Sequence, residues 1–146
     1  QNQTEIELRI PALLPEDYVP DVNMRLSFYK RIASAENVEA LKELKIELID
    51  RFGLLPEATK NLFQITQIRH LAKTLGLKKI EAGINGGFLE FKATATPDPM
   101  KFLKLIQQDK TAYKFDGPLK FKFAKPLESN EARLQFVSEL VETLTK

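Results

Sequence analysis

Two blocks decide the fold: LPEDYVPDVNMRLSFYKR at residues 14–31 and ELIDRFGLLP at residues 47–56. Pro20 and Asp21 open the first predicted helix, because proline interrupts strand pairing and an aspartate side chain caps free N–H groups. Gly53 ends the second helix, since glycine tolerates the left-handed backbone on which many helices stop. Pro56 opens a third helix, where its missing N–H costs nothing. The two blocks therefore predict three successive helices.

The rest of the chain changes from helix to strand. Alternating polar and apolar residues predict strands, and Gly-rich or Asp-Gly-Pro turns predict hairpins. The expected elements are a strand at 5–10, helices from 21 and at 37–52 and 56–75, a hairpin of 79–84 with 88–92, a helix at 98–108, a hairpin of 112–115 with 119–123, and a helix at 130–145. The predicted class is α+β, with a helix-rich N-terminal half packed with antiparallel β-hairpins and a C-terminal helix. No linker divides the chain, so residues 1–146 are expected to form a single domain.

Composition excludes several classes of protein. The chain has no cysteine, which rules out disulfides and thiolate metal sites and favours a reducing cytoplasm. No segment approaches the ~20 apolar residues that cross a bilayer, so no membrane association is expected. The chain starts without methionine, which favours a fragment of a longer protein.

No enzymatic chemistry is expected. His70 is the single histidine, so a serine nucleophile has no convincing base–carboxylate pair. Zinc needs three good ligands, which carboxylates alone do not supply here. Gly86-Gly87 lacks the Lys-Ser/Thr of a phosphate-binding loop. The sequence therefore predicts no catalytic residue, no metal and no cofactor within this chain.

Carboxylates share one side of the second predicted helix. At 100° per residue they fall within about 80° of one another, with Ile46 near their edge. They are Glu39, Glu43, Glu47 and Asp50. The opposite side is expected to enter the core with Leu41, Leu44, Leu48, Ile49 and Phe52. A solvated face is one interpretation. A docking surface for a basic partner is the other, because it explains the like charges at i,i+4 and the exposed isoleucine, with partner arginines pairing bidentately to Glu47 and Asp50.

A basic strand at 119–123 gives a competing interpretation. It lies in a basic segment, residues 78–125, that carries 10 Lys/Arg against 5 Asp/Glu. The candidate phosphate contacts on this strand and beside it are Lys114, Lys120, Lys122 and Lys125. Such lysines either guard a sheet edge or bind phosphate. Phe121 and Phe123 are expected in the core, which leaves Tyr113 as a candidate for base stacking. A small basic nucleic-acid-binding module is therefore the alternative function.

The two opening blocks, with their spacing, closely resemble the C-terminal domain of the bacterial transcription-repair coupling factor. The likeness continues through Gly76-Leu77, Gly86-Gly87, Asp116-Gly117-Pro118 and the last helix. We assign to the fold the shared residues Pro20, Asp21, Arg25, Tyr29, Gly53 and Pro56.

The resemblance implies a non-enzymatic regulatory domain of a cytoplasmic, ATP-driven DNA translocase that acts in transcription-coupled nucleotide excision repair. ATP and Mg are expected for the parent motor, outside this chain. The implied direct partner is an N-terminal, excision-repair-like module of the same chain, whose surface for the repair ATPase the domain masks while restraining the motor. RNA polymerase, the repair ATPase and DNA are indirect partners through the parent protein. Our own inference places the contact at Glu39, Glu43, Ile46, Glu47 and Asp50.

Overall fold

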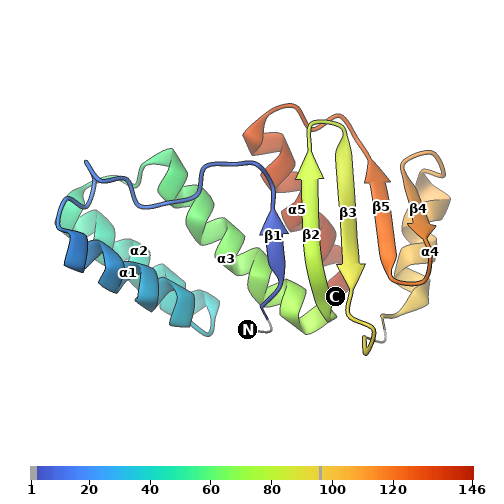
Figure 1. Ribbon diagram of the computed structural model, residues 1–146, viewed down its shortest axis with the longest axis horizontal. Helices are drawn as coiled ribbons and strands as arrows, with labels where there is room; N and C mark the ends of the chain where they lie inside the picture. Colours follow the sequence, from blue (N-terminus) through green and yellow to red (C-terminus); the bar gives the residue numbers. More distant parts are fainter. Residues whose placement is uncertain (1–2, 96) are drawn as a thin grey trace. The chain divides into compact units, whose positions relative to one another are not determined.

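The computed structural model describes residues 3–95 and 97–146. Figure 1 shows the elements in chain order: β1 (Glu5–Glu7), α1 (Val22–Ser34), α2 (Val38–Phe52), α3 (Glu57–Leu75), β2 (Leu77–Gly83), β3 (Gly86–Phe91), α4 (Pro99–Gln108), β4 (Tyr113–Asp116), β5 (Lys120–Ala124) and α5 (Asn130–Thr145). The α+β class is confirmed. The chain divides into two compact units, which we call the helical unit (residues 10–70) and the sheet unit (residues 1–9 and 71–146). That residues 1–146 act as a single domain stays a prediction.

Local signals in the sequence set the ends of the helices in the helical unit. The Asp21 carboxylate accepts the Met24 N–H at 2.9 Å and begins α1. Asn37 begins α2 in the same way, as a side-chain cap on its first turn. Gly53 ends α2 with φ +93°, and its N–H donates to the Ile49 carbonyl at 2.9 Å. These ends match the predicted boundaries.

The loop before α1 is tied to the helices by residues of the first sequence block. The Tyr29 hydroxyl accepts the Leu14 N–H at 2.8 Å, and the Arg25 guanidinium donates to the Val19 carbonyl at 2.7 Å. Tyr18 donates from its hydroxyl to the Gly53 carbonyl at 2.7 Å. The buried core beneath these contacts contains Leu14, Val19, Phe28, Ile32, Leu41, Leu44, Leu48 and Phe63. The block therefore encodes how the loop and helices pack.

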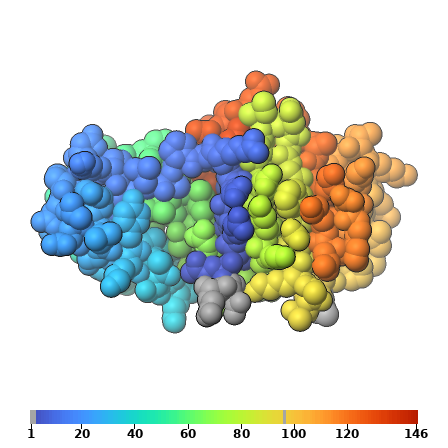
Figure 2. Space-filling view, in the orientation of Figure 1, coloured from blue at the N-terminus to red at the C-terminus, as the bar shows by residue number. Residues whose placement is uncertain are grey.

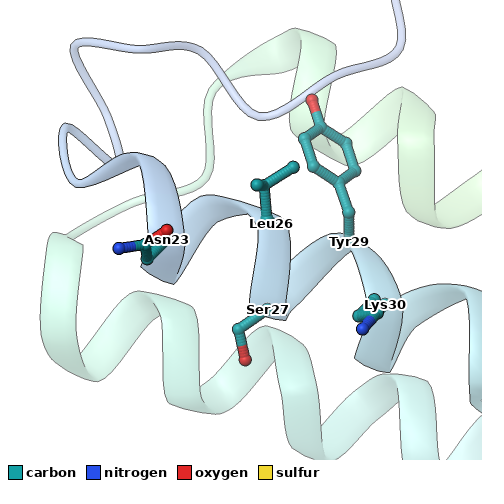
Figure 3. A pocket seen from close by; sticks show the side chains of 5 residues that line it. All are labelled: Asn23, Leu26, Ser27, Tyr29 and Lys30. Carbon is teal, nitrogen blue, oxygen red and sulfur yellow. The ribbon is translucent and has the colours of Figure 1, made fainter.

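Two large apolar residues of the helices are exposed. Ile49 is 40% exposed, so the prediction that it enters the core is wrong, and Leu26 of α1 is 55% exposed. At 100° per residue, Leu26 points about 160° away from buried Phe28, and Ile49 lies about 100° from buried Leu48. Leu26 and Tyr29 point to the same side of α1 and line an open hollow of about 480 Å³ (Figure 3).

The sheet unit contains one mixed sheet of order β1-β2-β3-β5-β4. Both predicted hairpins form, with antiparallel pairing of β2 with β3 and of β4 with β5. Sequence reasoning missed two pairings: β1 runs parallel to β2, and β5 joins the hairpins by pairing with β3. Helices α4 and α5 lie on one face of this sheet (Figure 1), over buried side chains that include Ile80, Leu89, Phe91, Phe121 and Phe123.

Arg133 of α5 is buried, with 3% exposure. Its guanidinium donates to the Leu8 carbonyl at 3.0 Å, to the Leu127 carbonyl at 2.9 and 3.1 Å, and to the Glu128 carbonyl at 3.2 Å. One side chain thus joins α5 to the end of β1 and to the loop that follows β5. Sequence reasoning assigned it no role.

Candidate protein-interaction site

The acidic side of α2 is continuous and faces solvent. The helix is unbroken from Val38 to Phe52. Its exposed residues include the carboxylates Glu39, Glu43 and Asp50, which we call the acidic ridge. On the other side of the helix Leu41, Leu44 and Leu48 are buried, which fixes the rotation of α2. The ridge is therefore held in place before any partner arrives.

Exposed aliphatic residues border the acidic ridge. Val38 is 53% exposed, Ile46 is 55% exposed, and Ile49, misassigned to the core from sequence, is 40% exposed. We call these three residues the apolar strip. Their helical angles place Val38 and Ile49 within about 20° of each other around the axis, at opposite ends of α2, with Ile46 turned toward the carboxylates. Together the strip and the ridge offer an apolar patch with a charged rim, which is how protein interfaces are commonly built.

Glu47 differs from the other carboxylates of α2 because two arginines of the helical unit already form ion pairs with it. Its two oxygens accept hydrogen bonds from Arg31 of α1 at 2.6 and 2.9 Å, and Arg51 approaches one of them at 3.4 Å. The bidentate position expected for a partner arginine is thus taken by Arg31. The sequence did not indicate this, because it depends on how α1 packs against α2.

The ion pair keeps both of its members charged. The hydrogen bond from Arg31 lowers the pKa of Glu47 below its ordinary value, and the same bond raises the pKa of Arg31. We call Arg31, Glu47 and Arg51 the guanidinium clasp. With two guanidinium groups and one carboxylate, it has a net charge of +1.

The candidate phosphate-binding lysines lie among acidic and aromatic groups. Lys120 lies 4.4 Å from the centroid of the Phe88 ring, Lys122 pairs with Asp116 at 3.7 Å, and Lys125 pairs with Asp109 at 3.9 Å. Exposed Lys114 is directly opposite Lys122 in the β4–β5 register.

Lys125 lies apart from the other three lysines. It contacts the rings of Tyr113 and Phe136, which belong to β4 and α5. Lys114, Lys120 and Lys122 occupy the open face of the sheet, whose strands are uncovered in Figure 2. The strand register carries a row of alternating charge across that face: Glu5, Lys79, Glu90, Lys120 and Asp116. Cations and carboxylates therefore alternate along this row.

Tyr113 is buried against Phe121 and is not presented to solvent for base stacking. It is 8% exposed and stacks on Phe121 with ring centroids 5.7 Å apart and an interplanar angle of 7°. The prediction that it contacts bases is wrong, because its side chain turns to the same buried side as Phe121. Phe88 is the partly exposed aromatic of the open face, and Lys120 covers its ring.

Within residues 3–95 and 97–146, no group of three or more candidate side chains is placed to hold a metal ion. Among the helices of these same residues, none has the length and apolar character needed to span a bilayer.

Comparisons with known proteins place these features in a family. The fold matches a crystal structure of the C-terminal domain of a transcription-repair coupling factor, with a TM-score of 0.83 and 23% identity over 98% of this chain and 92% of that one. This α+β architecture is therefore that of a coupling-factor C-terminal domain. Residues 8–102 match the TRCF domain family, and the chain belongs to that family.

Two relatives are much longer than this chain. The transcription-repair-coupling factor of Haemophilus influenzae is 60% identical over 144 residues, which cover 99% of this chain and 13% of the relative. That of Escherichia coli is 45% identical over 142 residues, which cover 97% of this chain and 12% of the relative. The chain thus spans about an eighth of the length of these proteins.

Proposed function

We propose that this chain is an autoinhibitory protein-interaction domain of a transcription-repair coupling factor. It docks through the acidic ridge and the apolar strip of α2 onto the N-terminal, excision-repair-like module of the same polypeptide. The observation that carries the proposal is an ordered helix face that combines exposed carboxylates with Ile46, at 55% exposure, while its other side is packed. Among the described residues these side chains remain exposed, so packing inside the chain does not account for them.

A modest interface is sufficient for this task. A tether between two parts of one polypeptide supplies an effective concentration of order mM, so docking in cis does not need tight intrinsic affinity. Charges at the rim favour fast and reversible association, while a few apolar contacts supply the specific core. The acidic ridge and the apolar strip have this composition.

Docking in this way masks the surface of the N-terminal module that the repair ATPase would bind and restrains the translocase. The parent protein acts in transcription-coupled nucleotide excision repair in the cytoplasm. Its motor uses ATP and Mg, and its contacts with RNA polymerase and DNA lie outside this domain, which itself does no catalysis. The alternative, a small basic nucleic-acid-binding module, gains no specific support from lysines paired with Asp109 and Asp116.

Charge reversal in the full-length coupling factor tests the proposal. Glu43→Lys combined with Asp50→Lys should raise basal ATPase activity severalfold and expose binding of the repair ATPase, because the reversed ridge repels a basic surface. Both readouts are measured on the purified full-length protein. The control is Glu16→Lys with Asp17→Lys, which makes the same charge change at exposed positions of the loop before α1. If ridge and control variants match wild type in both readouts, the proposal is wrong.

A further inference from the structure

Arg51 is the less completely neutralised cation of the guanidinium clasp. Arg31 occupies both oxygens of Glu47 at 2.6 and 2.9 Å, whereas Arg51 reaches one of them at 3.4 Å. The other terminal nitrogen of Arg51 donates to the Met24 sulfur at 3.3 Å. A thioether is a weak acceptor, so the net positive charge of the clasp resides mainly on Arg51.

Aromatic rings hold this guanidinium in a defined place. Its central carbon lies 5.4 Å from the centroid of the Phe52 ring and 5.8 Å from that of Phe28. The side chain is still 45% exposed, and its two hydrogen bonds to described residues use two of the five N–H donors of a guanidinium. A planar, partly ordered guanidinium with unused donors is suited to bidentate recognition of a carboxylate.

Arg51 also follows Asp50 of the acidic ridge directly in sequence. A partner surface that is basic throughout would meet the ridge favourably but would be repelled by the clasp. A surface of mixed charge satisfies both features, and a pattern of opposite charges fixes the register of docking.

We propose that Arg51 binds a carboxylate of the docking partner. The partner surface then carries a carboxylate next to the cationic groups that meet Glu43 and Asp50. This inference rests on the proposed function, since it concerns the same interface and adds a specificity-determining residue to it.

Removal of the positive charge at position 51 tests the inference, because the affinity for the partner should fall if Arg51 binds a carboxylate and rise if the partner surface is basic throughout. The 146-residue chain is titrated with the separately produced N-terminal module of the parent coupling factor. Arg51→Gln is compared with Lys60→Gln, because both remove one positive charge from an exposed position of the helical unit and Lys60 belongs to α3. We expect Arg51→Gln to weaken binding about 10-fold, as for loss of a charge-assisted hydrogen bond, and Lys60→Gln to leave it unchanged or tighter. If Arg51→Gln tightens binding or leaves it at the level of Lys60→Gln, the inference is overturned.

A second variant identifies the carboxylate. Arg51→Lys places a primary amine at position 51. A carbodiimide joins such an amine to a carboxylate as an amide only when the two groups are in contact. We expect a new cross-link between position 51 and an Asp or Glu of the N-terminal module, located by mass spectrometry and absent from the wild type. No such cross-link in a complex that forms would count against Arg51.

Failure of the proposed function looks different. In that case Glu43→Gln with Asp50→Asn would leave wild-type binding unchanged, or the wild type would not bind the module at all.

Discussion

Arg133→Ala is expected to lower the free energy of unfolding by about 3–5 kcal/mol. The guanidinium is 3% exposed and supplies hydrogen bonds to the carbonyls of Leu8, Leu127 and Glu128. Alanine would leave these carbonyls short of donors and open a cavity between α5 and the end of β1. Because the bond to Leu8 joins α5 to a segment 125 residues away along the chain, its loss loosens the sheet unit as a whole.

Urea unfolding of the 146-residue chain, followed by circular dichroism, measures this effect. Gln135→Ala is the matched control, since Gln135 is exposed on the same helix and its replacement should stay within about 0.5 kcal/mol of wild type. Arg133→Lys keeps the charge but loses the planar fork, so we expect an intermediate loss. An unfolding midpoint for Arg133→Ala equal to that of Gln135→Ala would contradict this account of the buried guanidinium.

Glu43→Lys combined with Asp50→Lys is expected to weaken docking of the isolated chain on the N-terminal module about 100-fold or more. Each substitution replaces an attraction for a basic surface by a repulsion, and like charges in an interface cost several kcal/mol. A loss of about 2.7 kcal/mol already corresponds to 100-fold. Because docking in trans lacks the tether, its affinity is weak at the outset, and the double variant should show no measurable binding.

Titration at two salt concentrations provides the measurement. Wild-type binding should weaken as salt rises, because exposed charges are screened over about 10 Å at 0.1 M ionic strength. The variant Glu16→Lys with Asp17→Lys carries the same change in net charge and should bind like wild type. Equal weakening by the two double variants would show that net charge, and not the ridge, controls binding.

Much of the fold could be predicted from the sequence because its signals are local. Asp21, Gly53 and Asp98 begin or end helices through bonds to neighbouring residues, and the structure has these boundaries where the sequence places them. The parallel pairing of β1 with β2 could not be predicted in this way. Glu5 pairs with Lys79, and no pattern within a short strand identifies a partner so distant along the chain.

The candidate site was predictable in outline for the same reason. The spacing of carboxylates on α2 follows from helix geometry alone, and Glu43 and Asp50 are exposed as that geometry requires. The binding of Glu47 by Arg31 depends on the packing of α1 against α2, which periodicity does not encode. Ile49 was misassigned because it lies at the boundary between the buried and the exposed side of α2. At that boundary the position around the helix axis does not determine whether a side chain is buried.

The central claim is that the outer face of α2 becomes covered when the domain docks, and thiol labelling tests it most directly. The chain has no cysteine, so Ile46→Cys introduces a single thiol at a position that is 55% exposed. Leu54→Cys places the control thiol just beyond α2, at a position that is 87% exposed. With saturating N-terminal module, we predict that maleimide labelling slows at least about 10-fold at position 46 and stays unchanged at position 54. Labelling at position 46 that is as fast with the module bound as without it would contradict the account.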